Sequence, residues 1–365
     1  MDQRRRALAA SGGVLVLFLL VQIGTLALVE PFQASGLQPD VDHQDPTNSL
    51  LYVVAILVAT GFMLLAIRYD VARLIRVFIV FSGAYVAVFV FRVVIPPLLV
   101  VAEFHVLAWL AGALLGIALW VYPEWYVIDA AGVVMGIAAA ALFGITFGVL
   151  PAIVLLVVLA IYDAISVYRT EHMLTLAGGV MEMRVPIVLV VPLTLTYSFL
   201  EAELPDPTGG DEDEAGADDE AEGMPEGEMP DAGAVDEATT AAADEEPTQA
   251  AAEEGEGPPP AADRDALFIG LGDAVIPTVL VASAAFFAPG SAPSLGVPYL
   301  SMTLPTLTAM VGTVAGLAGL LWMVLKGRAH AGLPLLNGGT ILGYLGGSLL
   351  AGVSLVEALG LSGIV

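Results

Sequence analysis

Two aspartates interrupt long apolar runs of this chain, and they are its first candidates for chemistry. Asp163 follows Tyr162 in one run, and Asp273 follows the tripeptide at 270–272 in another. A charged side chain in an apolar membrane interior costs about 2.5–3.5 kcal/mol or more, so a carboxylate there is a functional-site hypothesis. A third unusual stretch, Leu333-Pro334-Leu335-Leu336, opens the last apolar run.

Two carboxylates held close together can activate a water molecule. Like charge and desolvation oppose the ionisation of both, so one carboxyl group keeps its proton. The ionised member then acts as a base and the protonated member as an acid, which is the chemistry of attack on a peptide carbonyl. Asp163 and Asp273 can do this only if the elements that carry them bring them together.

Composition indicates a membrane protein built of helices. The chain has 365 residues, 58% of them hydrophobic, and its apolar runs are long enough to cross a bilayer as helices. Polar and apolar residues do not alternate in these runs, so helices must satisfy the backbone there. Cysteine is absent, which excludes disulfides and thiolate chemistry. The first run follows Arg4-Arg5-Arg6 and is interpreted as a retained anchor.

Nine transmembrane helices are predicted, in an all-α fold with a cytoplasmic N-terminus and an extracellular C-terminus. With this orientation, eleven of the twelve basic residues fall inside or at the inner boundary, and only Arg92 falls on the outer half. The cell membrane is therefore the expected location. The predicted spans are 7–29, 50–67, 74–98, 104–121, 126–148, 150–168, 266–288, 300–325 and 334–356.

One apolar segment, 185–200, is not counted as a span. It is 16 residues long and contains Pro186 and Pro192, and counting it would spoil the charge asymmetry. We expect an interfacial or re-entrant piece beside the sixth span. Small residues spaced four apart predict close helix packing rather than catalysis; they are Gly112/Gly116, Gly132/Gly136, Gly312/Gly316 and Gly339/Gly343/Gly347.

An acidic linker divides the chain into three parts. Residues 201–265 hold 24 Asp or Glu against the single Arg264, a net charge of -23, and they have almost no large apolar side chain. The segment is predicted to be a disordered cytoplasmic linker. Before it, residues 1–200 hold spans one to six and the interfacial piece, and after it, residues 266–365 hold spans seven to nine. Such acidity with one lysine fits a halophilic source; the alternative is an ordinary solubilising tail.

The predicted topology places the two aspartates at one depth. Asp163 lies six positions before Arg169 as the sixth span descends, and Asp273 lies eight positions after Asp265 as the seventh ascends. At helical rise, both carboxylates lie roughly 9–12 Å below the inner boundary. They stand on antiparallel neighbouring spans, so they can face each other.

Glycine and proline beside these residues predict irregular backbone at the same depth. Gly270 and Gly272 flank Leu271 and loosen the helix, which lets an extended substrate backbone approach Asp273. Pro334 disfavours helix at the start of the last span, and irregular backbone at membrane depth is tolerated only beside a cavity or inside protein. Tyr162 is either a packing aromatic or a hydrogen-bond partner of the pair.

These motifs, in this order, resemble the presenilin and signal peptide peptidase family of intramembrane aspartyl proteases, most of all an archaeal presenilin homologue. Family members have nine spans, with Tyr-Asp in the sixth, Gly-x-Gly-Asp in the seventh and Pro-Ala-Leu at the ninth. The resemblance implies that Asp163 and Asp273 are the catalytic pair. It implies that Pro334 and Leu336 belong to the substrate-positioning motif, in which Leu335 replaces the alanine.

The resemblance also implies substrates and reactants. The arginine distribution matches the presenilin orientation, for which single-span substrates with cytoplasmic C-termini, cut near the inner face, are expected. Water is the only other reactant, with no metal, organic cofactor or nucleic acid. Protein partners are neither required nor excluded. The alternatives are an ion or proton transporter that uses the buried aspartates, a prepilin-peptidase-like enzyme and a catalytically silent scaffold.

Overall fold

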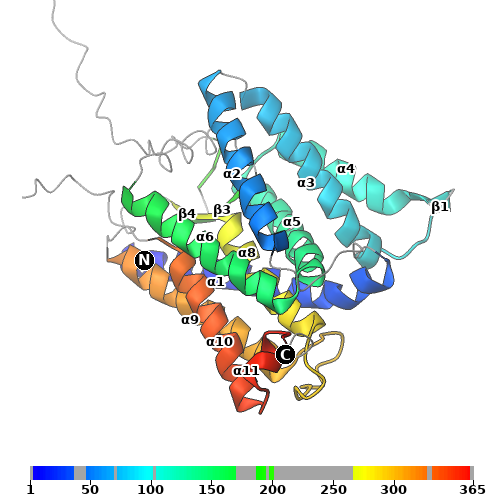
Figure 1. The fold of residues 1–365 in the computed structure, drawn as a ribbon. Helices are drawn as coiled ribbons and strands as arrows, with labels where there is room; N and C mark the ends of the chain where they lie inside the picture. The colour runs from blue at the N-terminus through cyan, green and yellow to red at the C-terminus, as the bar shows by residue number, and fades with distance from the viewer. Residues whose placement is uncertain are drawn as a thin grey trace, which may run out of the picture.

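The computed structural model describes residues 3–36, 47–69, 72–101, 104–169, 186–194, 197–200, 266–326 and 331–361. The predicted linker at 201–265 lies outside the described residues, so its predicted disorder is untested. Within them the chain is mostly helical (Figure 1). The helices are α1 (Gln3–Ala34), α2 (Thr47–Arg68), α3 (Ala72–Val94), α4 (Val106–Val121), α5 (Trp125–Thr146), α6 (Val149–Arg169), α8 (Leu271–Phe286), α9 (Leu304–Leu325), α10 (Leu333–Leu350) and α11 (Leu355–Ala358).

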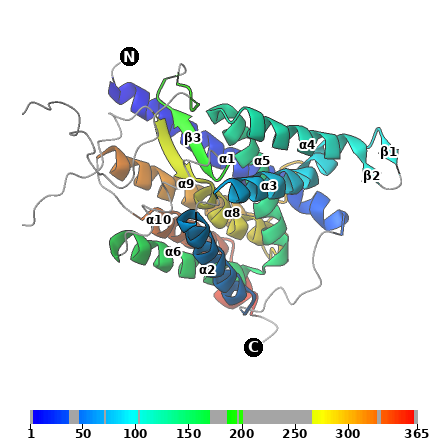
Figure 2. The ribbon, with the colours of Figure 1, turned by 90° about the horizontal axis from the view of Figure 1, so that it is seen from above.

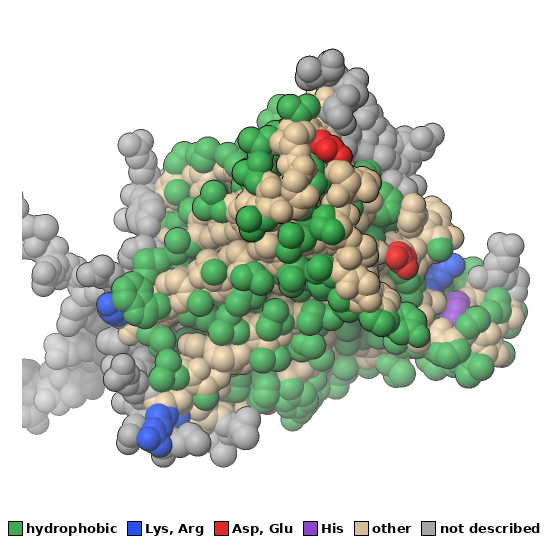
Figure 3. Space-filling view, turned by 90° about the horizontal axis from the view of Figure 1, so that it is seen from below, with side chains coloured by type: hydrophobic (Ala, Val, Ile, Leu, Met, Phe, Trp, Pro, Cys, Tyr) green, Lys and Arg blue, Asp and Glu red, His purple; other side chains and the backbone are tan. Residues whose placement is uncertain are grey.

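Each of the nine predicted intervals contains a helix among the described residues. Five helices are long and apolar enough to cross a membrane, and they lie in α1, α3, α5, α6 and α9. Figure 3 shows a face that is mostly hydrophobic, with few charged side chains, as expected of a surface in contact with lipid. The fold is therefore that of a multi-pass membrane protein, while the count of nine spans and the orientation of the termini stay predictions.

Helices α1, α5 and α8 pack against one another, and α6 and α10 lie against α8 (Figures 1 and 2). The largest buried cluster joins α6, α8, α9 and α10 around Leu156, Leu280 and Tyr344. Apolar burial of this kind leaves few polar groups to satisfy, and the buried threonines and serines donate to carbonyls in their own helices or in neighbouring ones, as Ser283 does to Phe147.

The fold is not purely α-helical, because two small antiparallel sheets are present. β1 (Val100–Val101) pairs with β2 (Phe104–His105), and β3 (Val188–Pro192) pairs with β4 (Ala266–Gly270). Within the apolar segment 185–200, residues Val188–Pro192 are strand and pack on α5 and β4, so the expectation that this segment is interfacial stays a prediction. β4 corrects the seventh span, whose predicted start at 266 is strand; the helix begins at Leu271.

Glycines bring α9 and α10 into direct backbone contact, which confirms their prediction as packing residues. A Cβ on Gly312 would overlap the carbonyl of Gly339, and a Cβ on Gly343 would overlap that of Thr308. Thr313 and Thr340 share a hydrogen bond of 2.8 Å across the same interface. Close approach of this kind is how membrane helices gain attraction where lipid is as apolar as leucine.

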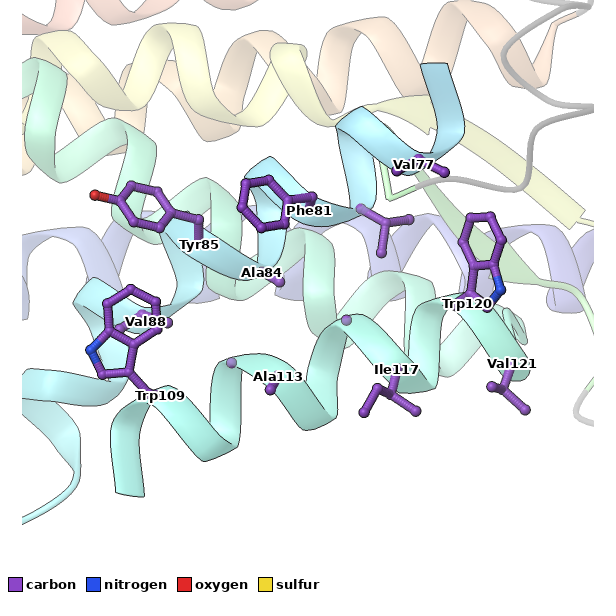
Figure 4. Close-up of a pocket in the computed structure, with 13 residues that line it drawn as sticks. Val77, Phe81, Ala84, Tyr85, Val88, Trp109, Ala113, Ile117, Trp120 and Val121 are labelled. Atoms are coloured by element: carbon purple, nitrogen blue, oxygen red, sulfur yellow. The ribbon is translucent and has the colours of Figure 1, made fainter. Parts of the chain in front are cut away.

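Helices α3 and α4 enclose an apolar groove of about 530 Å³ (Figure 4). Phe81 and Tyr85 of α3 line it opposite Trp109 and Trp120 of α4. Gly112 lets the helices approach, because a Cβ there would lie 3.1 Å from the carbonyl oxygen of Ala84. The lining of this groove contains no carboxylate, so the groove offers no pair of carboxyl groups for acid–base catalysis.

Candidate active site

Asp163 lies near the end of α6 and is buried, with 6% of its surface exposed. Its Oδ2 accepts a hydrogen bond of 3.0 Å from the backbone N–H of Leu333, the first residue of α10. That N–H has no partner inside its own helix, because the first four amides of any helix lack one. The start of α10 therefore satisfies the carboxylate, and the carboxylate satisfies the start of α10.

Asp273 occupies the first turn of α8, where the chain passes from strand to helix. β4 ends at Gly270, which is also the N-cap of α8, and Asp273 follows three residues later. A Cβ placed on Gly270 would lie 3.6 Å from Oδ2 of Asp273, and one on Gly332 would lie 3.8 Å from the same atom. Both glycines therefore leave the backbone close to this carboxylate on two sides.

The two aspartates line one cavity of about 220 Å³. Its wall comes from α6, β4, the first turn of α8, the last two turns of α9 and the residue before α10. The lining residues are Asp163, Val167, Leu267, Phe268, Ile269, Gly270, Asp273, Leu320, Leu321, Val324 and Gly332. Segments from both sides of the acidic linker thus build a single site.

Each carboxylate stands at a helix N-terminus. Asp273 belongs to the first turn of α8, and Asp163 accepts from the first turn of α10. Exposed N–H groups and aligned peptide dipoles make a helix N-terminus attractive to negative charge, by roughly 0.3–1 kcal/mol and more where water is excluded. This offsets part of the cost of holding a carboxylate in an apolar surrounding.

The other predicted site residues lie around this cavity rather than in its wall, apart from Gly270. Tyr162 is 38% exposed and does not line the cavity. Leu271 is buried against α5, while Gly272 is exposed and has room for a Cβ, the nearest atom being Ile276 Cδ1 at 3.8 Å. The structure therefore joins the two aspartates and Gly270.

The prediction of irregular backbone at the start of the last span is wrong. Leu333 to Leu336 form the first turn of α10, with Pro334 at its second residue, and the N-cap before them, Gly332, also has right-handed helical dihedral angles (φ -78°, ψ -47°). Proline suits the first turn of a helix, because its missing N–H needs no partner there. Leu336 is fully buried, and the Leu335 carbonyl lies against Gly316 of α9.

Three features of the site were not predicted. Gly332 lines the cavity, the Leu333 amide binds Asp163, and a further buried carboxylate, Asp129, accepts from β3. The Gly-Leu-Pro sequence at 332–334 was a usable signal for the first two, because it marks a helix start. Within the described residues no group of three or more His, Asp or Glu is placed to hold a metal ion.

A mostly helical apolar fold that brings two aspartates to one cavity defines the class of intramembrane aspartyl proteases. Residues 15–353 match the family model described as "Signal-peptide peptidase, presenilin aspartyl protease", so the chain belongs to that family. Among curated proteins, none matches the chain.

Two solved structures are similar over almost their whole length. Both are described as a presenilin family intramembrane aspartate protease, one in space group C222 and one in P2. The first is 29% identical, with a TM-score of 0.56 over 93% of this chain and 99% of its own. The second is 29% identical, with a TM-score of 0.55 over 93% and 97%. The expected family is thereby confirmed, and with it an enzyme of the intramembrane aspartic endopeptidase class.

Proposed function

We propose that this protein hydrolyses peptide bonds of single-span membrane proteins with Asp163 and Asp273 as an acid–base pair. The observation that supports the pair most directly is their shared cavity of about 220 Å³, bounded by a β-strand. A catalytic cavity between helices inside the membrane gives water a place beside a substrate that lipid otherwise keeps dry.

The proposed reaction needs only the two carboxyl groups and one water. The ionised carboxylate takes a proton from the water, whose oxygen attacks the scissile carbonyl carbon, and the protonated carboxyl group gives its proton to the carbonyl oxygen. The C–N bond of the tetrahedral intermediate then breaks as its nitrogen takes the proton that the base removed from water, while a hydroxyl group of the intermediate returns a proton to the acid. The hydrogen bond from Leu333 holds Asp163 in orientation during these transfers.

The substrate is held, in this proposal, as a strand added to β4. Leu271 donates to Ile187 over 2.7 Å, and the register continues with Val188 opposite Gly270. In an antiparallel ladder, pairs that exchange hydrogen bonds alternate with pairs that do not. Phe268 and Gly270 stand in pairs that do not, so their N–H and C=O groups point away from β3. Among the described residues this sheet has only two strands.

That outward edge of β4 borders the cavity, because both Phe268 and Gly270 line it. A substrate helix must unwind before its carbonyl can be attacked, and its freed backbone groups then need partners that lipid lacks. Strand addition supplies those partners. It also explains why a strand directly precedes Asp273.

The substrate class follows from the proposed orientation. With eleven of twelve basic residues at the cytoplasmic side, the cavity lies near the inner face of the cell membrane. We therefore propose single-span substrates with cytoplasmic C-termini, cut close to that face.

The direct test is to incubate the purified full-length protein in lipid vesicles with a generic single-span peptide. Mass spectrometry of the products should locate cleavage within the part of the span nearest the inner face. Vesicles in which the peptide stays intact, while the protein drives an aspartate-dependent proton or cation flux, would instead establish the transporter alternative.

We expect the cleavage rate to follow a bell-shaped dependence on pH. At low pH the base of the pair becomes protonated, and at high pH the acid loses its proton, so activity falls on both sides. The profile of kcat/KM for a peptide without titratable groups near its cleavage site measures this, with protein integrity checked by gel filtration. A rate that rises steadily into alkaline solution would indicate a single base or hydroxide.

Deletion of residues 205–260 should leave catalysis largely intact, within about threefold of the full chain, because the closure entropy of a flexible loop changes slowly with its length. We propose that this segment is a linker between two parts, 1–200 and 266–365, and that it can be shortened without changing either. The measurement is kcat/KM of the deletion variant in vesicles. Normal membrane insertion with no cleavage would assign the segment a direct role.

A further inference from the structure

A third buried carboxylate, Asp129, lies outside the cavity and takes no part in the proposed proton transfers. It belongs to the second turn of α5 and is 7% exposed. Its Oδ1 accepts a hydrogen bond of 2.7 Å from the backbone N–H of Val190, the central residue of β3. A carboxylate bound to a backbone amide in an apolar core is a strong interaction that such a core rarely contains without a reason.

The direction of that N–H follows from the strand register. Val190 stands opposite Phe268, and this pair, like Val188 with Gly270, exchanges no ladder hydrogen bonds. The N–H of Val190 therefore points to the outer edge of β3, away from β4. Pro192 shares this outer edge and has no N–H at all. The outer edge of β3 therefore offers a further strand no free N–H at Val190 or at Pro192.

One face of α5 carries both Asp129 and the glycines that seat the sheet. Gly132 and Gly136 follow Asp129 by three and seven residues, which places all three on one helical face. A Cβ on Gly132 would lie 3.0 Å from Leu189 of β3, and one on Gly136 would lie 3.2 Å from Leu271 at the start of α8. The same face of α5 therefore supports β3 and the turn that carries Asp273.

A further buried carboxylate on the α5 side binds residues that follow β3. Glu124, the residue before α5, accepts hydrogen bonds of 2.6 Å from the Ser198 hydroxyl and 3.0 Å from the Phe199 N–H. Two carboxylates of α5 and its N-cap therefore bind this part of the chain, one within β3 and one after it. The inner edge of β3 pairs with β4, so whatever fixes β3 also fixes β4.

We infer that Asp129 is a positioning residue for substrate: its bond to Val190 anchors β3 on α5, holds β4 beside Asp273 and, among the described residues, leaves the outer edge of β4 for a substrate strand. This inference rests on the proposed function for its last clause. It assigns Asp129 an effect on the docking of the peptide and none on the proton transfers.

Kinetics of Asp129→Ala and Asp129→Asn test this assignment. We expect the alanine variant to raise KM about tenfold or more while kcat changes little, because one strong hydrogen bond that orders the docking strand is lost. The asparagine variant keeps an oxygen that accepts from Val190, so its KM should return to near the wild-type value. The matched control is Tyr344→Phe, which removes the buried hydrogen bond from Tyr344 to the Ala358 carbonyl, far from the sheet. It should leave KM unchanged.

The donor itself can be removed by Val190→Pro, which deletes the N–H without breaking a bond to β4. Because both changes break the same interaction, Asp129→Ala combined with Val190→Pro should lose about tenfold in kcat/KM, as each single variant does. A loss near a hundredfold, the product of the two, would show that Asp129 acts elsewhere and would overturn the inference.

Hydrogen exchange of the full-length protein supplies a readout that needs no activity. In Asp129→Ala, the amides of Leu189, Ile269 and Leu271 should exchange about tenfold faster or more than in the wild type or in Tyr344→Phe, because the paired strands loosen together. Unchanged exchange in the sheet, or a fall in kcat at constant KM, would overturn the positioning role. If the wild type cleaves no peptide while the exchange result holds, the proposed function fails and the structural anchor stands.

Discussion

Asp163→Ala and Asp273→Ala should each reduce cleavage of a single-span peptide by about 10⁴-fold or more, and the double variant should be no slower than either single one. Each carboxyl group handles a proton that the other cannot replace, so the pair acts as one unit. Their common cavity makes this expectation specific to these two residues. The measurement is the single-turnover rate in vesicles.

Asparagine variants separate chemistry from folding in this experiment. Asp163→Asn keeps an oxygen that accepts from the Leu333 amide, so the start of α10 stays satisfied while the acid–base function is lost. Insertion and thermal unfolding should match the wild type. Retention of more than about one hundredth of the rate by either asparagine variant would contradict the proposed pair.

Phe268→Pro should lower kcat/KM by about a hundredfold through the edge of β4. Phe268 stands in a pair that exchanges no ladder bonds with β3, so proline removes a donor only from the edge that faces the substrate. The lost hydrogen bond and the ring that replaces the N–H both oppose strand addition. Peptide kinetics and binding of an uncleavable analogue measure the loss.

Two substitutions control for the side chain and for the sheet. Phe268→Ala keeps the N–H but loses the ring contact with Phe199, whose centroid lies 6.2 Å away, so it should cost much less activity. Ile269→Pro removes an N–H that faces β3 and should loosen the two strands themselves. Equal losses in Phe268→Pro and Phe268→Ala would show that the edge of β4 does not hold the substrate.

The two aspartates could be predicted from sequence because charge in an apolar run is conspicuous, and helical arithmetic was enough to place Asp163 and Asp273 near each other. The family was predictable for the same reason, since its motifs surround these residues. Asp129 was not predicted as a functional residue, because it lies close to the predicted start of a span, where a carboxylate is expected at the membrane interface. Its partner, a backbone amide, leaves no mark in the sequence.

The sheet shows a second limit of sequence interpretation. The apolar segment 185–200 is short and is interrupted by Pro186 and Pro192, which predicted a segment that does not span. The pairing of Val188–Pro192 with Ala266–Gly270 joins residues separated by the acidic linker, and no local pattern encodes such a partner. Glycines before Asp273 were expected to loosen a helix; a strand ends there instead.

Pro334 was expected to leave irregular backbone because proline lacks an N–H and disfavours helix in the residue before it. At the second position of a helix, proline sacrifices no intrahelical hydrogen bond. Whether a proline starts a helix or interrupts one depends on the residues before it. Gly332 is the N-cap, and α10 begins at Leu333. Pro334 therefore lies in the first turn of α10 and leaves the helix regular.

The contact of α9 with α10 sets where this enzyme can move. Gly312 and Gly339 leave no side chain between the two backbones, so sliding of one helix along the other brings backbone atoms into overlap. The two helices must therefore travel as one body, and the Leu333 amide moves with them. Admission of a peptide to the cavity then requires a shift of α6 or of β4 relative to that body. A shift of α6 would separate Asp163 from the Leu333 amide, whereas a shift of β4 would leave that hydrogen bond in place and move the strand beside Asp273.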